Sequence, residues 1–239
     1  MTNKLRHISP TVFSKASERF LDLLFPSKCI GCGKEGIVIC SSCADTFIRV
    51  KRPYCEKCGL PLKTEAACPK CRKWPLKIER IRSVFIYEGL ARDAVHAFKY
   101  NNLKLLSKPL ARLMADYLNA DPMPADVLVP VPIHPRRMRQ RGYNQAELLA
   151  TELSKILEIP VWRKALVRIS NTPSQISLKA EQRRRNVSNA FKCRDQGIEG
   201  RSVLLIDDVC TTGATLNACA VALYKTKAAS VRGLTLTRE

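Results

Sequence analysis

Eight cysteines in the N-terminal third of the chain fall into four C-x₂-C pairs. The pairs are Cys29/Cys32, Cys40/Cys43, Cys55/Cys58 and Cys68/Cys71. A C-x₂-C pair presents two thiolates to one ion from a tight turn, and two pairs complete a tetrahedral shell with no open position. Such clustering favours metal over disulfides in a reducing compartment. The spacing therefore predicts a double zinc ribbon with two structural Zn²⁺ ions.

The order of the pairs allows two ways of sharing the ions. Sequential pairing joins the first pair to the second and the third to the fourth, and we expect this arrangement. An interleaved arrangement stays open at this point. A redox dithiol is disfavoured because that chemistry needs a thioredoxin-like βαβ context, which the flanking sequence lacks.

A second group of residues that could bind a ligand lies in the segment VLLIDDVCTTGAT, residues 203–215. Four apolar residues predict a buried strand that ends at Asp207 and Asp208. The next residues predict a short loop that opens a helix. Backbone N–H groups, hydroxyls and a helix dipole that converge there suit a phosphate group. The two carboxylates would repel a phosphate and suit sugar hydroxyls instead, so the segment predicts a site for a phosphosugar such as ribose 5-phosphate.

Two other interpretations of this segment have less support. An apolar strand ending in two aspartates also resembles a Walker B element, but the chain contains no G-x₄-G-K-[ST] motif. A plain turn at the end of a strand leaves the TTGAT sequence unexplained.

The elements that must position these residues follow from the sequence pattern. Residues 28–76 are too poor in large apolar side chains to fold without a stabilising cross-link such as a bound metal ion. From residue 78 onward, strands alternate with helices. We expect strands at 81–89, 125–132, 202–207 and 230–238, and helices at 90–100, 103–119 (interrupted by Pro109), 144–159 and 214–227. A polar, arginine-rich stretch covers 168–190. This order predicts an α/β fold with a mostly parallel sheet, helices on both faces and ligands at the carboxyl ends of the strands.

Three domains are expected: an N-terminal amphipathic helix within 1–27, the zinc ribbons at 28–76 and the α/β domain at 78–239. The helix, at residues 11–25, is expected to dock onto the body of the protein, with membrane association as the alternative. No apolar stretch is long enough to span a membrane, so membrane insertion is not expected. The N-terminus lacks the apolar core of a signal peptide, which favours a cytoplasmic location.

The charge of the chain is strongly positive. The 239 residues include 41 Lys and Arg against 21 Asp and Glu, a formal net charge of +20. Such a surface attracts nucleic acid, phosphorylated metabolites or anionic lipid without choosing among them. Only 6% of the residues are aromatic, which weakens the case for an extended base-stacking platform.

The motifs and their order resemble the ComF family (ComFC/GntX-like competence proteins), in which a double zinc ribbon precedes a type I phosphoribosyltransferase domain. The segment 203–215 is similar to the family's motif for 5-phosphoribosyl 1-diphosphate (PRPP), with Cys210 in the second hydrophobic position. Further resemblance lies in LDLLFPSKCIGCGK (21–34), CEKCGLPL (55–62), YEGLARDAVHAFKY (87–100), VPVPIHPRRMRQRGYNQAELLA (129–150) and QRRRNVSNAF (182–191).

This resemblance implies roles for individual residues. Asp207 and Asp208 would bind the ribose hydroxyls. The 5-phosphate would be bound by Thr211, Thr212, Gly213, Ala214 and Thr215. The loop 130–145 would bind the diphosphate through Arg136, Arg137 and Arg141, and Asp207, Asp208 and Arg137 would be the catalytic residues. A flexible loop at 172–186 would close over the site through Gln175, Arg183, Arg184, Arg185 and Asn186. The arginines could instead be solvated surface. His134 could be a catalytic base, or it could have a structural or diphosphate-side role.

Two functional hypotheses follow from the resemblance. The first is an enzyme that binds PRPP with Mg²⁺ and transfers the phosphoribosyl group to an acceptor that the residues do not identify. The second is a non-catalytic module that keeps the fold and binds single-stranded DNA or other competence proteins. Either would serve DNA uptake and natural transformation, the role that the resemblance implies.

Overall fold

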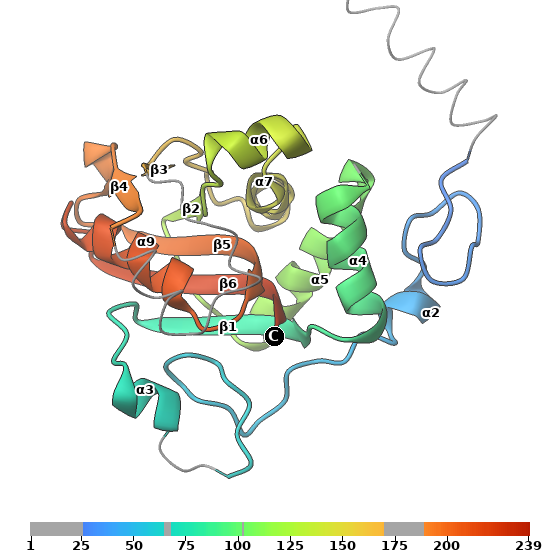
Figure 1. Cartoon of the computed structure of the whole chain (residues 1–239), viewed down its shortest axis with the longest axis horizontal. Helices are drawn as coiled ribbons and strands as arrows, with labels where there is room; N and C mark the ends of the chain where they lie inside the picture. The colour runs from blue at the N-terminus through green and yellow to red at the C-terminus, as the bar shows by residue number, and fades with distance from the viewer. Residues whose placement is uncertain (1–25, 65–67, 102, 170–188) are drawn as a thin grey trace, which may run out of the picture.

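A four-stranded sheet forms the centre of the molecule (Figure 1). The computed structural model describes residues 26–64, 68–101, 103–169 and 189–239. Every neighbouring pair in the order β1-β6-β5-β2 is parallel. The strands are β1 (Arg80–Ile86), β2 (Val127–Pro130), β5 (Ser202–Cys210) and β6 (Ser230–Arg238). A separate antiparallel pair consists of β3 (Leu166–Arg168) and β4 (Phe191–Cys193). The expected mostly parallel sheet is confirmed.

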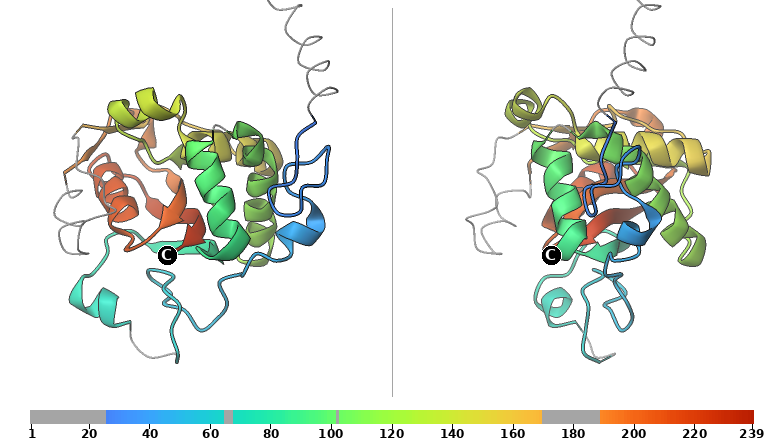
Figure 2. Two further views of the ribbon diagram at one scale, coloured as in Figure 1. Left: turned by 45° about the vertical axis from the view of Figure 1, so that its right-hand side comes forward. Right: turned by 90° about the vertical axis from the view of Figure 1, so that its right-hand side faces the viewer.

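Helices cover both faces of the sheet, also as expected (Figure 2). One face packs with α4 (Gly89–Tyr100), α5 (Ser107–Ala120) and α7 (Gln145–Leu157) around a core that includes Leu204 and Ile206. The other face packs with α9 (Ala214–Tyr224) around a core that includes Val203 and Leu205. Successive side chains of a strand point to opposite faces, so one apolar run supplies both cores.

The zinc-ribbon segments lie beside the edge strand β1. The first ribbon, residues 26–50, contains α2 (Ser41–Ala44), and its Phe47 ring meets Phe85 edge-on with centroids 5.1 Å apart. The second ribbon, residues 51–76, contains α3 (Pro69–Lys73), and its Lys57 carbonyl accepts a hydrogen bond of 2.9 Å from the Ile81 N–H. The ribbons therefore contact an edge strand that would otherwise expose unpaired backbone groups.

Several expected boundaries are wrong, including the end of β1, which lies at Ile86 rather than at residue 89. Pro109 does not interrupt a helix: a 3₁₀ turn, η1 (Lys104–Leu106), leads into α5, and Pro109 occupies its first turn. An N–H in the first turn has no intrahelical acceptor, so proline is tolerated there. Strand β5 continues past residue 207 because Cys210 still pairs with Arg238 of β6. Helix α9 ends at Tyr224 rather than at residue 227.

A further helix, α6 (Pro135–Arg141), lies within the stretch expected to be a loop. The imidazole Nδ1 of His134 caps it by accepting a hydrogen bond of 3.1 Å from the Arg136 N–H. Gly142 ends it with a φ of 75°. A short 3₁₀ turn, η3 (Gln196–Ile198), precedes β5.

Two expected features fall outside the described residues: the helix at 11–25 and the closing loop at 172–186. Strands β3 and β4 flank that loop, and neither was expected. Within the described part of the chain, no helix combines the length and apolar character needed to cross a membrane.

Candidate functional site

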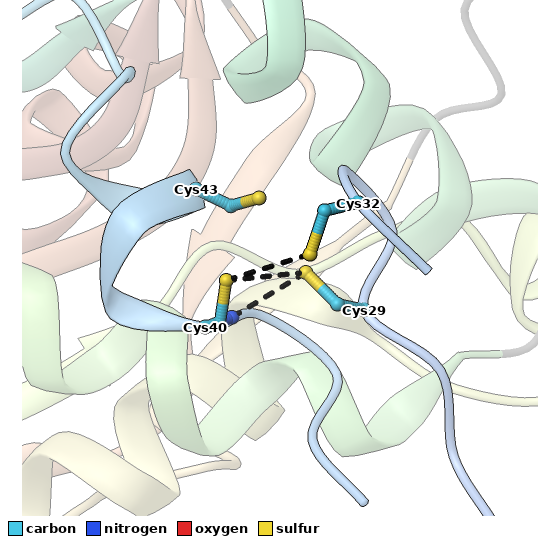
Figure 3. Close-up of side chains that lie close together, drawn as sticks. All are labelled: Cys29, Cys32, Cys40 and Cys43. Carbon is cyan, nitrogen blue, oxygen red and sulfur yellow. Dashed lines mark hydrogen bonds between the residues drawn. The ribbon is translucent and has the colours of Figure 1, made fainter. Parts of the chain in front are cut away.

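The cysteines of the first ribbon converge on one point (Figure 3). All four Sγ atoms, from Cys29, Cys32, Cys40 and Cys43, lie within 4.8 Å of one another. Two of the separations are 3.8 Å (Cys29 to Cys40) and 3.7 Å (Cys32 to Cys40). A tetrahedron with Zn–S bonds of about 2.3 Å has edges of about 3.8 Å. The Cys40 N–H also donates a hydrogen bond of 3.4 Å to Cys29 Sγ, a contact that stabilises the thiolate form that zinc needs.

The second ribbon repeats this arrangement with Cys55, Cys58, Cys68 and Cys71. The Sγ atoms of Cys55 and Cys71 are 3.7 Å apart, and those of Cys58 and Cys68 are 3.8 Å apart. The Cys58 N–H donates to Cys55 Sγ at 3.4 Å. Both sets are sequential, as expected, and the interleaved pairing is excluded. Each set fits one Zn²⁺ with four thiolates and no open position, so the ions would be structural.

A cleft of about 1560 Å³ lies at the carboxyl ends of β2 and β5. Nine of the residues proposed from the sequence line it: Arg136, Arg137, Arg141, Asp207, Asp208, Thr211, Gly213, Ala214 and Thr215. Thr212 does not; its hydroxyl accepts a hydrogen bond of 3.3 Å from the Ala214 N–H. The structure thus brings the acidic pair, residues 211–215 and the arginines of α6 to one place. We call residues 211–215 the phosphate loop.

The two aspartates of β5 have different surroundings. Asp208 is buried and forms an ion pair with Lys99 of α4, with 3.1 Å between Nζ and Oδ2. Asp207 is partly buried on the other face, and its Oδ1 accepts the Asp208 N–H at 2.9 Å. Burial, reinforced by the charge of Asp208, raises the pKa of Asp207 to about 7. One carboxylate therefore has a cationic partner, while the other titrates near neutral pH.

The phosphate loop depends on one glycine. Gly213 has a φ of 77°, and a Cβ atom there would lie 2.8 Å from Cδ1 of Ile81. A side chain would be strained and would also clash. As the N-cap of α9, Gly213 supplies no capping side chain. The amino end of α9, whose first residues Ala214 and Thr215 line the cleft, thus has the character of an anion site.

Cations surround the cleft. Arg137 and Arg141 of α6 are partly buried, and burial together with the charge of Arg141 lowers the pKa of Arg137. The cationic side chains that line the cleft are Lys99, Lys104, Arg136, Arg137, Arg139, Arg141 and Arg168. The carboxylates that line it are Asp207, Asp208 and Glu239. This excess of positive charge suits a ligand with several negative charges.

Comparison with known proteins finds two family models that match different parts of the chain. The double zinc ribbon family model matches residues 20–72, and the phosphoribosyl transferase domain model matches residues 100–238. "Competence protein ComFC" of Bacillus subtilis is 32% identical over 209 residues, which cover 84% of each chain. The chain belongs to the ComF family.

The chain is also similar to other known proteins. "DNA utilization protein YhgH" of Escherichia coli K12 is 32% identical to this ComF-family chain over 206 residues, covering 84% of it and 90% of the relative. Among solved structures, glutamine PRPP amidotransferase from B. subtilis matches with a TM-score of 0.38 and 18% identity. That match covers 54% of this chain and 26% of the other.

Sequence reasoning missed several residues that hold the ComF-family cleft in shape. Asn144 is buried, caps α7 at Ala146 N–H (3.1 Å) and donates to the Val131 carbonyl at 3.0 Å. Gln145 accepts a hydrogen bond of 3.2 Å from Arg141. An asparagine before a predicted helix is a recognisable cap signal. No pattern in the sequence around Lys99 identifies it as a site residue, because its approach to Asp208 depends on how α4 packs on the sheet.

Proposed function

We propose that this protein binds PRPP together with Mg²⁺ in the cleft and transfers the phosphoribosyl group to an acceptor. The observation that carries the proposal is the convergence of Asp207 and Asp208, the phosphate loop and α6 in one cleft. The phosphate loop would bind the 5-phosphate, and the two carboxylates would accept hydrogen bonds from the ribose hydroxyls. Arg136, Arg137 and Arg141 would bind the diphosphate.

The charges of the cleft support this reaction. When the bond between C1 and the diphosphate breaks, positive charge develops on the ribose and negative charge on the leaving group. Arg137 and Arg141, already fixed on α6, would stabilise the leaving diphosphate without reorganising. Asp207 and Asp208 would hold the ribose ring in place for attack. These carboxylates also offer the oxygen ligands that Mg²⁺ prefers, and the ion would neutralise charge on the diphosphate.

Isothermal titration with PRPP and Mg²⁺ tests the proposal. We expect wild type to bind and the double variant Asp207→Ala/Asp208→Ala to lose at least about tenfold in affinity, a loss of roughly 1.4 kcal/mol. Asp93→Ala is the matched control, because Asp93 is an exposed carboxylate outside the cleft. Folded, zinc-loaded wild type that gives no heat with PRPP would refute the proposal.

A second candidate function is a non-catalytic one: binding of single-stranded DNA or of a competence partner. It is favoured by Tyr100, which lines the cleft, is 55% exposed and lies under the Arg141 guanidinium at 5.1 Å. Such a pair can stack on a nucleobase. Release of diphosphate from PRPP in the presence of candidate acceptors would separate the two functions, because only the enzyme releases it.

We extend to this chain the role in competence and DNA utilization that the names of its relatives state. A cytoplasmic location belongs to the same proposal. It is supported by the eight ligand thiols, which must stay reduced to hold zinc.

A further inference from the structure

We propose that the second zinc ribbon positions the phosphate loop through Arg238, so that zinc at the Cys55/Cys58/Cys68/Cys71 site and ligand in the cleft strengthen each other's binding. This inference rests on the proposed function, since it concerns the same cleft. It makes Arg238 a positioning residue that touches the zinc site and the approach to the phosphate loop, but not the ligand.

Arg238 joins the two sites directly. Its side chain is buried, and its Nη1 donates to the Cys58 carbonyl at 2.6 Å and to Cys210 Sγ at 3.1 Å. Cys58 is one of the four zinc ligands, and Cys210 immediately precedes the phosphate loop. One guanidinium nitrogen therefore connects the metal-binding turn to the end of β5.

The charge of Arg238 strengthens this link. A buried guanidinium needs a compensating anion. Among the residues that the structure describes, no carboxylate pairs with Arg238, and its Nη1 contacts only the Cys58 carbonyl and Cys210 Sγ. A Zn²⁺ ion with four thiolates has a formal charge of −2. The loaded zinc site is thus the anion that matches Arg238, and loss of zinc would remove it.

Ile81 of β1 provides a second connection. Its backbone N–H donates to the Lys57 carbonyl at 2.9 Å, in the turn between Cys55 and Cys58. Its side chain lies against Gly213, where a Cβ atom would come within 2.8 Å of Ile81 Cδ1. A shift of the turn would therefore move the residue that packs against the phosphate loop.

The segment that follows α3 provides a third connection. The Asn217 side-chain oxygen, in the first turn of α9, accepts hydrogen bonds from the backbone N–H groups of Lys77 (2.6 Å) and Ile78 (3.2 Å). This ties the exit of the second ribbon to the helix whose amino end the phosphate loop opens.

The first ribbon serves as an internal control. Its backbone hydrogen bonds to β1 go to the opposite end of that strand: Val50 N–H to the Val84 carbonyl (3.0 Å) and Ile86 N–H to the Ile48 carbonyl (2.8 Å). Among the described residues, none of its hydrogen bonds reaches residues 210–217. Zinc at the first site should therefore affect the cleft far less than zinc at the second.

Thermodynamic linkage makes the coupling measurable from either side, because ligand must raise zinc affinity by the same factor as zinc raises ligand affinity. The first experiment measures, at equilibrium, how much zinc the full chain releases to a competing chromogenic chelator, with and without saturating PRPP and Mg²⁺. We expect two zinc ions per chain, of which one is bound at least about fivefold more tightly when PRPP is bound. Asp207→Ala/Asp208→Ala, treated identically, corrects for any zinc held by PRPP itself.

Paired variants then assign the protected ion. Cys71→Ser should lower PRPP affinity by about tenfold, whereas Cys32→Ser in the first ribbon should change it by less than about twofold. Arg238→Lys keeps the positive charge and a long side chain but replaces the planar guanidinium and its several N–H donors with a single ammonium group. We expect it to retain two zinc ions and a normal thermal transition while losing most of the PRPP protection.

The outcomes separate the two proposals. PRPP binding with unchanged release of both ions, or full protection in Arg238→Lys, overturns the positioning role and leaves the proposed function standing. Equal effects of Cys32→Ser and Cys71→Ser also overturn it. Absence of PRPP binding in calorimetry overturns the proposed function and this inference together.

Discussion

Neighbouring acidic residues in a strand point to opposite faces, which gives Asp207 and Asp208 different tasks. Asp208 shares its face with Leu204 and Ile206 and meets Lys99 of α4. Asp207 shares its face with Val203 and Leu205, on the side of α9. A ligand at the end of β5 would therefore meet one carboxylate that is paired with Lys99 and one that forms no ion pair among the described residues.

The raised pKa of Asp207, about 7, predicts that PRPP affinity increases with pH. An ionised carboxylate accepts hydroxyl hydrogen bonds better than a protonated one, so affinity should rise between pH 6 and 8 and then level off. Below the pKa the change approaches about tenfold per pH unit. Asp208, Lys99 and Arg168 are the charged groups that act on Asp207. Calorimetry across this range measures the effect.

Asp207→Asn supplies the baseline for that profile. The phosphate groups of the ligand also titrate, at about pH 6. The variant should bind more weakly and keep only the dependence that comes from the ligand. A wild-type profile that matches the shape of the variant profile would show that Asp207 does not control binding.

The same carboxylate predicts a conflict between stability and function. Because the folded-state pKa of Asp207 lies above its unfolded value of about 3.9, the free energy of unfolding falls as pH rises from about 4 to 7. At pH 8 the free energy of unfolding of Asp207→Asn should therefore exceed that of wild type by on the order of 1–3 kcal/mol, measured as a higher unfolding temperature. The gain should shrink at pH 4 to 5. A variant less stable than wild type at pH 8 would contradict the burial argument.

At the level of single residues, the sequence was most informative where the interacting groups are close together in the chain. The C-x₂-C pairs predict their own ion geometry, because both ligands of a pair sit in one turn. The separation of Asp207 and Asp208 onto two faces follows from strand geometry alone. Lys99 and Arg238 were not predicted as partners, because each meets its partner only through packing of elements that are distant in the chain.

At the level of elements, buried strands were predictable and helix α6 was not. Strand β5 begins with an apolar run at residues 203–206, the pattern of a strand covered on both faces. Strand β6 instead alternates leucine with threonine, a pattern of period two that also predicts a strand. Helix α6 has no buried residue and hence no apolar periodicity. Only its terminal signals mark it: His134 and Pro135 at the start and Gly142 at the end. The true end of β5 depends on pairing with β6, which a local pattern does not contain.

Gly213→Ala tests how the phosphate loop is built. The left-handed conformation costs a side chain about 1–2 kcal/mol, and the new Cβ atom would also displace Cδ1 at the end of the Ile81 side chain, which packs against the phosphate loop. We expect a lower unfolding temperature and at least about tenfold weaker PRPP binding, roughly 1.4 kcal/mol.

Gly200→Ala is the matched control for Gly213→Ala. Gly200 has a similar φ of 72°, but a Cβ atom there would meet nothing within 4 Å, and the residue lies outside the cleft. This variant should lose only the conformational part of the stability and bind PRPP normally. Equal losses of affinity in both variants would mean that general destabilisation, not the phosphate loop, controls binding.

At the level of the whole molecule, both zinc ribbons contact the α/β domain at the edge of the sheet formed by β1. Buried Arg82 of β1 pairs with Glu56 of the second ribbon and, at 3.1 Å, with Asp121 at the end of α5. The first ribbon adds Ile39 and Phe47 to the main core. The ribbons are therefore built into the α/β body, which is the structural condition for communication between zinc and cleft.

The net charge of +20 leads to a prediction that separates the two candidate functions. If single-stranded DNA neutralises about five of the cleft cations, log affinity should fall with log salt at a slope of about −3.5. Raising salt from about 50 to 200 mM would then weaken binding about 100-fold. Fluorescence anisotropy of a labelled oligonucleotide measures this, and PRPP with Mg²⁺ should displace the oligonucleotide from a shared cleft. Salt-independent binding would rule out the cationic surface as the DNA site, and salt-dependent binding that PRPP leaves untouched would place the DNA outside the cleft.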